Sequence, residues 1–297
     1  MRIIRAQHLG MCFGVRDAIE LAIDRAAAAP LTILGDLVHN ATVLARLRAR
    51  EIAIAHHPAD VTTPTVMVTA HGASERTLAS TRALGLEVVE ATCPLVQVAH
   101  QAVKALRRDG YHPVIIGQRG HVEVRGLTDD LDDFDVVLDE DDVLALEGHS
   151  RIGIAAQTTQ PIERVRHLVA LIRRRFAQSD VRFIDTVCQP TKQRQDAAVA
   201  LARQSDVVIV VGGASSNNTR ELVTTCRRYC SQVHHVQTEA DLDPEWFLAA
   251  GTVGITAGTS TPDDVIDRVE AGIRNGCLPD TRRDDRPLPA RHLPRHE

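Results

Sequence analysis

Short apolar runs of strand length recur along the chain and alternate with longer stretches in which apolar residues follow a helical period. The apolar runs cover residues 31–34, 66–68, 114–116, 152–155, 207–211 and 253–255. The helical stretches cover residues 17–28, 96–107, 162–176, 193–203 and 219–230. Strands that alternate with helices predict mainly parallel sheets in layered α/β units, and strands that are apolar throughout predict sheets covered by helices on both faces.

Each apolar run ends in a cluster of small and polar residues. In parallel α/β sheets, ligands bind beyond the carboxyl ends of the strands, where helix N-termini present free N–H groups. The same composition suits ordinary turns and helix caps, so no single cluster identifies a site. There are six such clusters. Two are split, one made of Gly35 and residues 39–40 and one of Gly117 and residues 120–121, and the other four are residues 70–72, 157–159, 212–219 and 257–260.

Three cysteines divide the chain at nearly regular intervals. Cys12, Cys93 and Cys188 lie 81 and 95 residues apart (93 − 12 and 188 − 93), and each stands just before a helical stretch. This spacing predicts three quasi-equivalent α/β units, each of which delivers one cysteine to a common centre.

The predicted units follow from the positions of the cysteines. We place them at residues 13–92, 93–188 and 189–276, with the N-terminal strand 1–12 joined to the third unit. Residues 277–297 are rich in Pro and Arg and lack apolar periodicity, so we expect a disordered tail.

Composition narrows the class of protein. Hydrophobic residues make up 44% and charged residues 25% of the 297 positions, which is typical of a soluble globular protein. A formal net charge of −5 argues against a general nucleic-acid binder. The chain has no apolar run of the roughly 18–20 residues that a membrane helix needs, and no secretion signal, so we expect a cytoplasmic protein without a membrane partner. Its six cysteines should therefore stay reduced.

The cysteine residues alone leave two interpretations open. Three thiolates on separate loops can hold a 4Fe-4S cluster and leave one iron without a protein ligand. Free cysteine is also a common small hydrophobe of protein cores, and the chain has no Cys-x-x-Cys pair. For Cys226 and Cys230, four apart on a predicted helix, and for Cys277, we favour plain thiols over a second metal site.

Sequence motifs spread along the chain, three of which contain Cys12, Cys93 or Cys188, favour the cluster interpretation. Nine motifs occur in this order: 10–15 (GMCFGV), 37–40 (LVHN), 69–72 (TAHG), 91–96 (ATCPLV), 120–124 (GHVEV), 157–159 (QTT), 185–188 (DTVC), 212–219 (GGASSNNT) and 256–262 (TAGTSTP). Together they resemble the 4-hydroxy-3-methylbut-2-enyl diphosphate reductase family, over about residues 3–269. The family reduces an allylic alcohol diphosphate to isopentenyl and dimethylallyl diphosphate in the methylerythritol phosphate pathway.

The resemblance implies a trefoil of three α/β units around a central 4Fe-4S cluster. It implies that Cys12, Cys93 and Cys188 are the cluster ligands, and that Glu123 and Thr158 handle protons. It places the diphosphate pocket on His39, His71, His121, Ser216, Asn217, Asn218 and Ser260. It also implies a ferredoxin or flavodoxin as electron donor and a monomer or homodimer.

The residue types suit this reaction. Hydroxide is a poor leaving group, so an acid such as Glu123 must supply a proton, and near neutral pH its pKa should be raised. The assigned pocket contains no Lys or Arg, and its histidines can become charged when a phosphate binds. We expect His121 and Glu123 to alternate on an extended segment and so to point the same way.

The chain departs from the family pattern at four places. Val122 replaces a usual proline, Leu127 a usual threonine, and Asn217 a usual serine, while 97–98 (Gln-Val) replaces Thr-Lys. None of these changes removes a predicted ligand or the predicted acid. They leave room for a divergent family member that acts on a related substrate or at a different rate. Two other classes also stay open: a cluster-based redox sensor or diphosphate-binding protein without turnover, and a zinc hydrolase with Cys and His ligands.

Overall fold

The computed structural model describes residues 1–276, which form three four-stranded sheets whose strand pairs are all parallel. The first sheet contains β2 (Leu31–Leu34), β3 (Ala53–Ala55), β4 (Thr65–Val68) and β5 (Glu87–Glu90). The second contains β6 (His112–Ile116), β7 (Asp135–Val137), β8 (Arg151–Ala156) and β9 (Asp180–Phe183). The third contains β10 (Val207–Val211), β11 (Gln232–Val236), β12 (Thr252–Ala257) and β1 (Arg2–Arg5).

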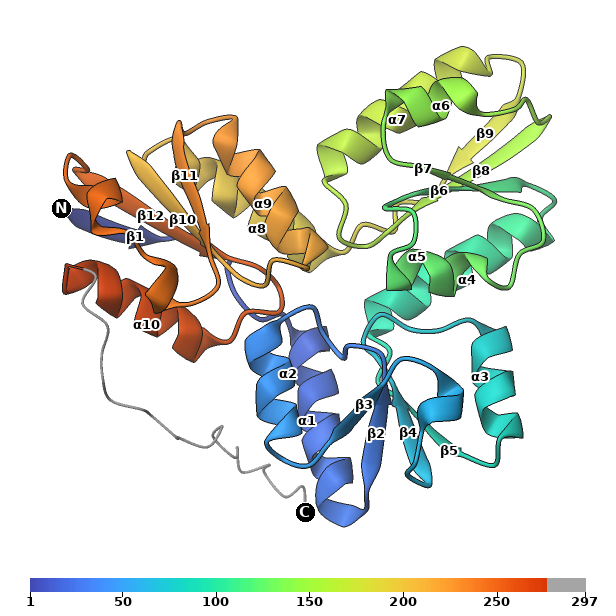
Figure 1. Cartoon of the computed structure of the whole chain (residues 1–297). Coiled ribbons are helices and arrows are strands. Elements are labelled where there is room, and N and C mark those ends of the chain that lie inside the picture. Colours follow the sequence, from blue (N-terminus) through green and yellow to red (C-terminus); the bar gives the residue numbers. More distant parts are fainter. Residues whose placement is uncertain (277–297) are drawn as a thin grey trace, which may run out of the picture.

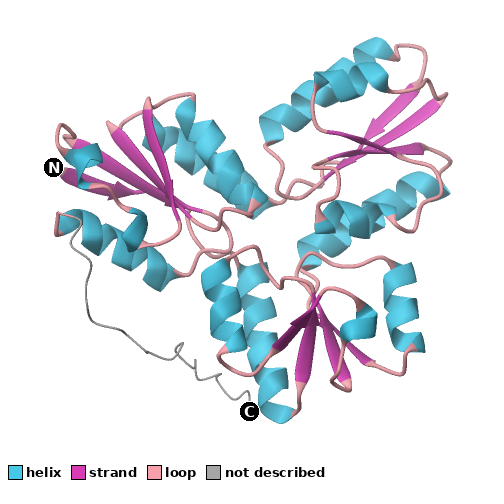
Figure 2. Ribbon diagram, in the orientation of Figure 1, coloured by secondary structure: helices cyan, strands magenta, loops and turns pink. Residues whose placement is uncertain are grey.

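Helices cover both faces of each sheet (Figure 2). The first sheet lies between α1 (Phe13–Ala28) with α2 (Ala41–Arg48) and α3 (Glu75–Ala83). The second lies between α4 (Pro94–Arg108) with α5 (Val122–Thr128) and α6 (Glu140–Ala145) with α7 (Ile162–Arg175). The third lies between α8 (Gln189–Ala202) with α9 (Asn217–Arg227) and α10 (Asp263–Arg274). The fold class expected from the sequence, three α/β units with parallel sheets, is confirmed, and the units surround a common centre (Figure 1).

The three sheets repeat one topology. Their strand orders are β3-β2-β4-β5, β7-β6-β8-β9 and β11-β10-β12-β1, so each sheet places its second strand outside its first and its fourth strand beyond its third. The N-terminal strand β1 takes the fourth position of the third sheet, where it pairs with β12. The ranges 13–92, 93–188 and 189–276 with 1–12 each enclose one complete sheet, and we propose them as the units of the fold. The predicted tail, 277–297, lies outside the described residues.

The six apolar runs of the sequence are the two central strands of each sheet. Central strands such as β10 are buried at every position, because helices cover both faces and strands cover both edges. Edge strands such as β9 alternate between exposed and half-buried positions, and they are only three to five residues long. Their weak apolar signal explains why the apolar runs do not include them.

Each unit has its own core of aliphatic side chains, and polar contacts lie where the units meet. Arg46 of the first unit binds Asp264 of the third, with 3.0 Å between Nη1 and Oδ1. Arg164 of the second unit binds Glu221 of the third at 2.6 Å. The N–H group of Glu75 in the first unit donates to the Asp130 carboxylate of the second at 2.8 Å. These contacts join neighbouring units outside the centre at which their loops converge.

Candidate active site

Each of the three predicted ligand cysteines occupies the same position in its unit. Cys12, Cys93 and Cys188 follow the fourth strand of a sheet and are the N-cap residues of α1, α4 and α8. The Cys93 sulfur accepts backbone hydrogen bonds at Leu95 and Val96, and the Cys188 sulfur accepts them at Thr191, in the first turns of their helices; these bonds act to lower the two thiol pKa values. Each helix N-terminus contributes a partial positive charge beside the sulfur, which favours a negatively charged thiolate.

An equivalent backbone hydrogen bond fixes each cysteine. The N–H groups of Cys12, Cys93 and Cys188 donate to the carbonyl groups of Thr259, Ala70 and Thr158 at 3.0, 3.1 and 3.1 Å. Each acceptor lies two residues after the third strand of a sheet. The three units therefore place their cysteines by the same backbone hydrogen bond, although their sequences show no repeat.

The three sulfurs lie in one region of the molecule. Burial is the main cause that raises the pKa of Cys93, and it raises the pKa of Cys188 to about 11. Negative charge on Cys12 and on Glu123 raises both values further, which requires these groups to be close. Gly14, in the first turn of α1, packs against Cys93 so closely that a Cβ atom there would overlap Sγ.

Three histidines meet beside the cysteines. The ring centroids of His39 and His71 are 4.4 Å apart, and those of His121 lie 5.2 and 5.7 Å from them. Burial lowers the pKa of His39, that of His71 further, and that of His121 to about 3. The rings are therefore neutral near pH 7 in the protein alone, and an anionic ligand would favour their protonation.

The pocket residues come from equivalent loops of the three units. His39, His121 and Ser216 each lie five residues after the first strand of their sheet. His71 and Ser260 each lie three residues after a third strand. The structure thus brings together residues that are far apart in the sequence, because parallel strands present their carboxyl ends at one edge.

Two side chains of this pocket carry buried nitrogen atoms without a partner among the described residues. These atoms are Nε2 of His39 and Nδ2 of Asn218. The other side of the Asn218 amide, Oδ1, accepts the N–H group of Thr259 at 3.0 Å, so the orientation of the amide is fixed while its amino group keeps no protein partner among the described residues. A buried donor without a partner costs about 1–3 kcal/mol, which a phosphate oxygen would offset.

The remaining predicted pocket residues contact protein groups. Ser216 caps α9 by accepting the N–H group of Thr219 at 3.3 Å. Ser260 Oγ donates to the carbonyl group of His39 at 3.3 Å. Asn217 Nδ2 donates to Thr159 Oγ1 at 3.2 Å and so joins the third unit to the second.

Glu123 is a buried carboxyl group beside the histidines and cysteines. It is 1% exposed, and it accepts the Thr158 N–H group at 2.6 Å and the Thr158 hydroxyl at 3.1 Å. Burial is the largest cause that raises its pKa to about 7, and the two bonds from Thr158 act against this rise. Since the Thr158 carbonyl also accepts the N–H group of Cys188, the acid is connected to a predicted ligand loop.

The expected extended segment at His121 and Glu123 is wrong. His121 is the N-cap of α5 and accepts the Glu123 N–H group at 3.1 Å, so Glu123 lies in the first turn of a helix. In an extended segment His121 and Glu123 would share one face, whereas in this helical turn the Glu123 carboxyl group is buried. Val122 occupies the first helical position, where proline is favoured but not required.

The pocket also has a cation nearby that the sequence analysis missed. The positive charge of Arg220 on α9 lowers the pKa of both His39 and His121, and Nη2 of Arg220 donates to Gln118 Oε1 at 2.8 Å. Its position in the first turn of the helix that follows the Ser216 motif was the available signal, because that turn faces the same centre.

Comparison with known proteins now identifies the family. A family model described as LytB protein matches residues 3–274. The chain belongs to the LytB family. The expected resemblance is thus confirmed, because curated relatives of this LytB chain carry the name 4-hydroxy-3-methylbut-2-enyl diphosphate reductase.

The similarity of this LytB chain to its relatives covers nearly their whole length. A reductase of that name from Pelobacter propionicus is 36% identical over 271 residues, which are 91% of this chain and 96% of the relative. One from Aquifex aeolicus is 35% identical, with 93% and 96% covered.

Two solved reductase structures also match the fold of this LytB chain. The diphosphate reductase of Plasmodium falciparum matches with a TM-score of 0.84 at 25% identity, over 91% of this chain and 87% of that one. A second reductase structure, described as the terminal enzyme of the non-mevalonate pathway, matches with a TM-score of 0.64 at 33% identity, over 93% and 100%. Within residues 1–276 of the LytB chain, no helix has the length and apolar character to span a membrane.

The other cysteines of this LytB chain lie away from the site. Cys226 and Cys230 belong to the apolar core of the third unit, and burial is the main cause that raises the pKa of Cys226 to about 12. Cys230 Sγ contacts three backbone carbonyl groups at 3.4 Å. Both are buried thiols, as favoured from the sequence, and Cys277 lies outside the described residues.

One further group of potential metal ligands occurs at the amino end of the second sheet. His112, Asp135 and His149 place their donor atoms within 4.8 Å of one another. His112 already binds Asp135 at 2.9 Å, and the two imidazole rings stack at 3.6 Å with 5° between their planes. The lone pairs of parallel rings do not converge, so one ring would have to turn before both could bind one ion.

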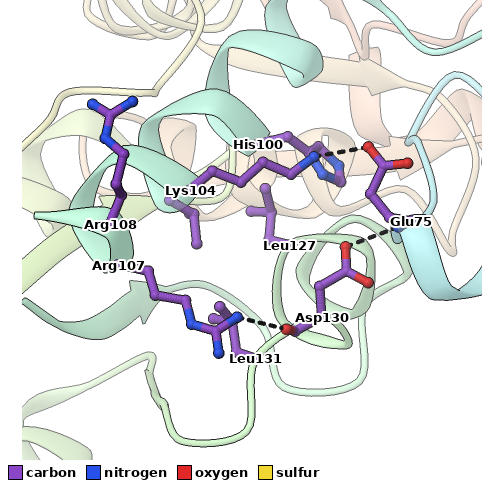
Figure 3. A pocket seen from close by; sticks show the side chains of 9 residues that line it. Glu75, His100, Lys104, Arg107, Arg108, Leu127, Asp130 and Leu131 are labelled. Carbon is purple, nitrogen blue, oxygen red and sulfur yellow. Dashed lines mark hydrogen bonds and ion pairs between the residues drawn. The ribbon is translucent and has the colours of Figure 1, made fainter. Parts of the chain in front are cut away.

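A cavity of about 520 Å³ lies between the first and second units, beside α4 (Figure 3). Its charged groups are already paired: Lys104 binds Glu75 at 2.8 Å, and Arg107 donates to the Asp130 carbonyl group at 3.2 Å. No predicted ligand, acid or pocket residue of the LytB site lines it. The cavity is therefore a space between the first and second units and is separate from the predicted active site.

Proposed function

We propose that this chain is a 4-hydroxy-3-methylbut-2-enyl diphosphate reductase that forms isopentenyl and dimethylallyl diphosphate in isoprenoid biosynthesis. The reaction takes an allylic alcohol, two electrons and two protons, and releases water. One observation carries the proposal: three N-cap cysteines from three units meet beside a buried acid and a cluster of three histidines. The names of the LytB relatives support the same activity.

The cysteines suit an iron-sulfur cluster. Cys12, Cys93 and Cys188 would hold a 4Fe-4S cluster by three thiolates, which leaves one iron open. The raised pKa values of Cys93 and Cys188 fit a site that becomes anionic only when metal compensates the charge. When bound, the cluster supplies electrons one at a time and a Lewis-acidic metal.

The histidine side of the pocket suits a diphosphate. His39, His71 and His121 offer ring nitrogens that are neutral in the protein alone and become cationic beside phosphate. Asn218 adds its unpaired amino group. We propose that Ser216, Asn217 and Ser260 complete the same pocket, with Arg220 adding positive charge at its edge.

Glu123 and Thr158 suit proton delivery to the other end of the substrate. With a pKa of about 7, the Glu123 carboxyl group is protonated in a large fraction of molecules at neutral pH. The Thr158 hydroxyl, 3.1 Å away, can pass on that proton by turning about its own bond. We propose Glu123 as the acid and Thr158 as the relay.

The activity is predicted to fall as pH rises above about 7. The pKa of Glu123 is raised, so the proton-donating form is present below about pH 7 and is lost as pH rises through that value. A single acid gives a fall of about tenfold per pH unit. Turnover measured from about pH 6 to about pH 9 should show this fall in activity above about pH 7. A flat profile would reject Glu123 as the acid.

Gly14→Ala is predicted to reduce iron loading far more than it weakens the fold. The helical backbone accepts alanine here, so the cost arises only at the contact with Cys93. The added Cβ would collide with Cys93 Sγ and displace a cluster ligand. Iron per chain after anaerobic reconstitution, with thermal unfolding of the metal-free protein, checks both parts.

Gly126→Ala is the matched control for this glycine. Gly126 also lies in a helix, α5, but its nearest neighbours would stand 3.5 Å from a new Cβ, an ordinary contact distance. This variant should load iron normally. Full iron loading in Gly14→Ala would show that the cluster does not depend on the observed Cys93 position.

Anaerobic reconstitution followed by a dithionite-driven assay with the allylic alcohol diphosphate tests the proposed function. We expect a brown protein with iron and sulfide and the two isoprenoid diphosphates as products. A loaded protein that binds the diphosphate without forming product would favour a redox sensor or binding protein. A colourless protein with stoichiometric zinc would favour a hydrolase.

The cellular context stays a prediction from the resemblance. We propose a cytoplasmic enzyme that receives electrons from a ferredoxin or flavodoxin and acts as a monomer or homodimer. Reducing conditions there would keep the three ligand cysteines available for iron.

A further inference from the structure

A buried arginine joins two of the three cysteine-bearing segments. Arg194 on α8 is 8% exposed, and its Nε and Nη2 atoms donate to the carbonyl oxygen of Gly10 at 3.0 and 2.8 Å. Its Nη1 atom donates to the carbonyl oxygen of Pro190 at 3.0 Å. Gly10 lies two residues before Cys12, and Pro190 lies two residues after Cys188. One planar guanidinium thus connects the loops that carry two predicted ligands.

The Gly10 carbonyl group accepts both hydrogen bonds from Nε and Nη2 of Arg194, a pair that we call the fork, and it is held in one orientation. Gly10 has a φ angle of +72°, which only glycine adopts readily. A Cβ atom there would lie 2.8 Å from Cδ1 of Ile266, so α10 closes the space behind it. The turn before Cys12 is therefore shaped to meet Arg194.

The three hydrogen-bond partners of Arg194 are neutral carbonyl groups. Among residues 1–276, no carboxylate lies within ion-pair distance of its guanidinium, although a buried charge without a counter-charge is costly. Burial lowers the pKa of Arg194, and the charges that oppose this are those of Cys12, Cys188 and Asp263. Two of the three groups whose negative charge would compensate Arg194 are thus cysteines that we predict to bind the cluster as thiolates.

We propose that Arg194 is a positioning residue of the cluster site, which holds the Cys12 segment against α8 and supplies the positive charge that stabilises the reduced cluster. The inference rests on the proposed function, because it requires the three cysteines to hold iron. A cation beside the cluster favours the state with one more electron, so it raises the reduction potential. The fork to Gly10 also slows the opening of the Cys12 loop through which iron would leave.

Two substitutions separate the charge from the fork. Arg194→Gln removes the charge, and Arg194→Lys keeps the charge but cannot reproduce the fork. Lys192→Gln is the matched control: it removes one positive charge from the same helix, but Lys192 pairs with Asp185 at 2.8 Å near the surface. The reduction potential and the rate of iron release to a chelator are measured anaerobically on the reconstituted full-length proteins.

We expect Arg194→Gln to shift the reduction equilibrium at least about tenfold toward the oxidised cluster, a fall of about 59 mV for one electron. Arg194→Lys should keep the potential but release iron about tenfold faster, because the hydrogen bonds to Gly10 are lost. Lys192→Gln should change neither quantity by more than about twofold, because Asp185 already pairs with the Lys192 charge.

A wild-type potential in Arg194→Gln, or a shift no larger than in Lys192→Gln, would overturn the role of the charge. A wild-type rate of iron release in both Arg194 variants would overturn the role of the fork. If Arg194→Gln does not fold, the iron-release rate of Arg194→Lys still tests the fork, and a wild-type rate there overturns the proposal that Arg194 positions the Cys12 segment. Failure of the wild-type protein to hold a cluster would instead refute the proposed function, so the two failures are distinguishable.

Discussion

Replacing Cys12, Cys93 or Cys188 by serine is expected to abolish both cluster binding and turnover while the chain stays folded. Each cysteine is one of three predicted protein ligands, and a serine oxygen is a harder, weaker ligand for iron in such a cluster. The fold should persist, because a serine hydroxyl can accept the same first-turn hydrogen bonds and the backbone bonds that fix each position remain. Iron and sulfide per chain, visible absorbance and turnover measure the effect.

Cys230→Ser is the control for the loss of a sulfur atom. Cys230 lies in the core of the third unit, where its Sγ contacts backbone carbonyl groups that a serine hydroxyl could also contact. This variant should retain iron and activity. If one of the three ligand variants kept full iron, that cysteine would not be a ligand and the threefold arrangement would fail.

The second large effect is expected at the buried acid. Glu123→Gln should keep the cluster and the substrate affinity but slow turnover at least about a hundredfold, the usual contribution of a general acid. The amide has nearly the same shape and can still accept the Thr158 N–H group, now 2.6 Å from Oε1, but it cannot donate a proton as an acid. Single-turnover product formation and substrate binding to the loaded protein separate the two quantities.

Glu75→Gln provides a matched control, because Glu75 is an exposed acid of the first unit whose side chain pairs with Lys104. It should leave turnover unchanged. Normal turnover in Glu123→Gln would show that another group delivers the proton. The fall in activity above about pH 7 should also disappear in Glu123→Gln, because the titrating carboxyl group is gone.

The central strands could be predicted from the sequence because burial on both faces leaves continuous apolar runs. Strands β2 and β10 begin and end at the predicted residues. Edge strands such as β3 and β7 have only three residues each, which is too short to give a clear apolar run. The spacing of the cysteines predicted three units for a different reason. The three sheets share one topology, so each unit carries its cysteine at an equivalent position.

The site could be predicted only as a set of residues, not as a geometry. Motifs placed His121 and Glu123 together, but the turn that buries Glu123 depends on α5 packing against α4, which a local pattern does not reveal. Arg220 was missed because its influence on His39 arises only when α9 of the third unit meets the first unit. Arg194 was missed because its partners are backbone carbonyl groups, which have no sequence signature.

Mössbauer spectroscopy of the reconstituted protein, with and without the allylic alcohol diphosphate, tests the central claim most directly. Three cysteine ligands leave one of four irons without a protein sulfur, so that iron should give a distinct signal, and addition of the diphosphate should change this signal alone. Four equivalent irons, or a spectrum that the diphosphate does not alter, would contradict the proposed cluster site.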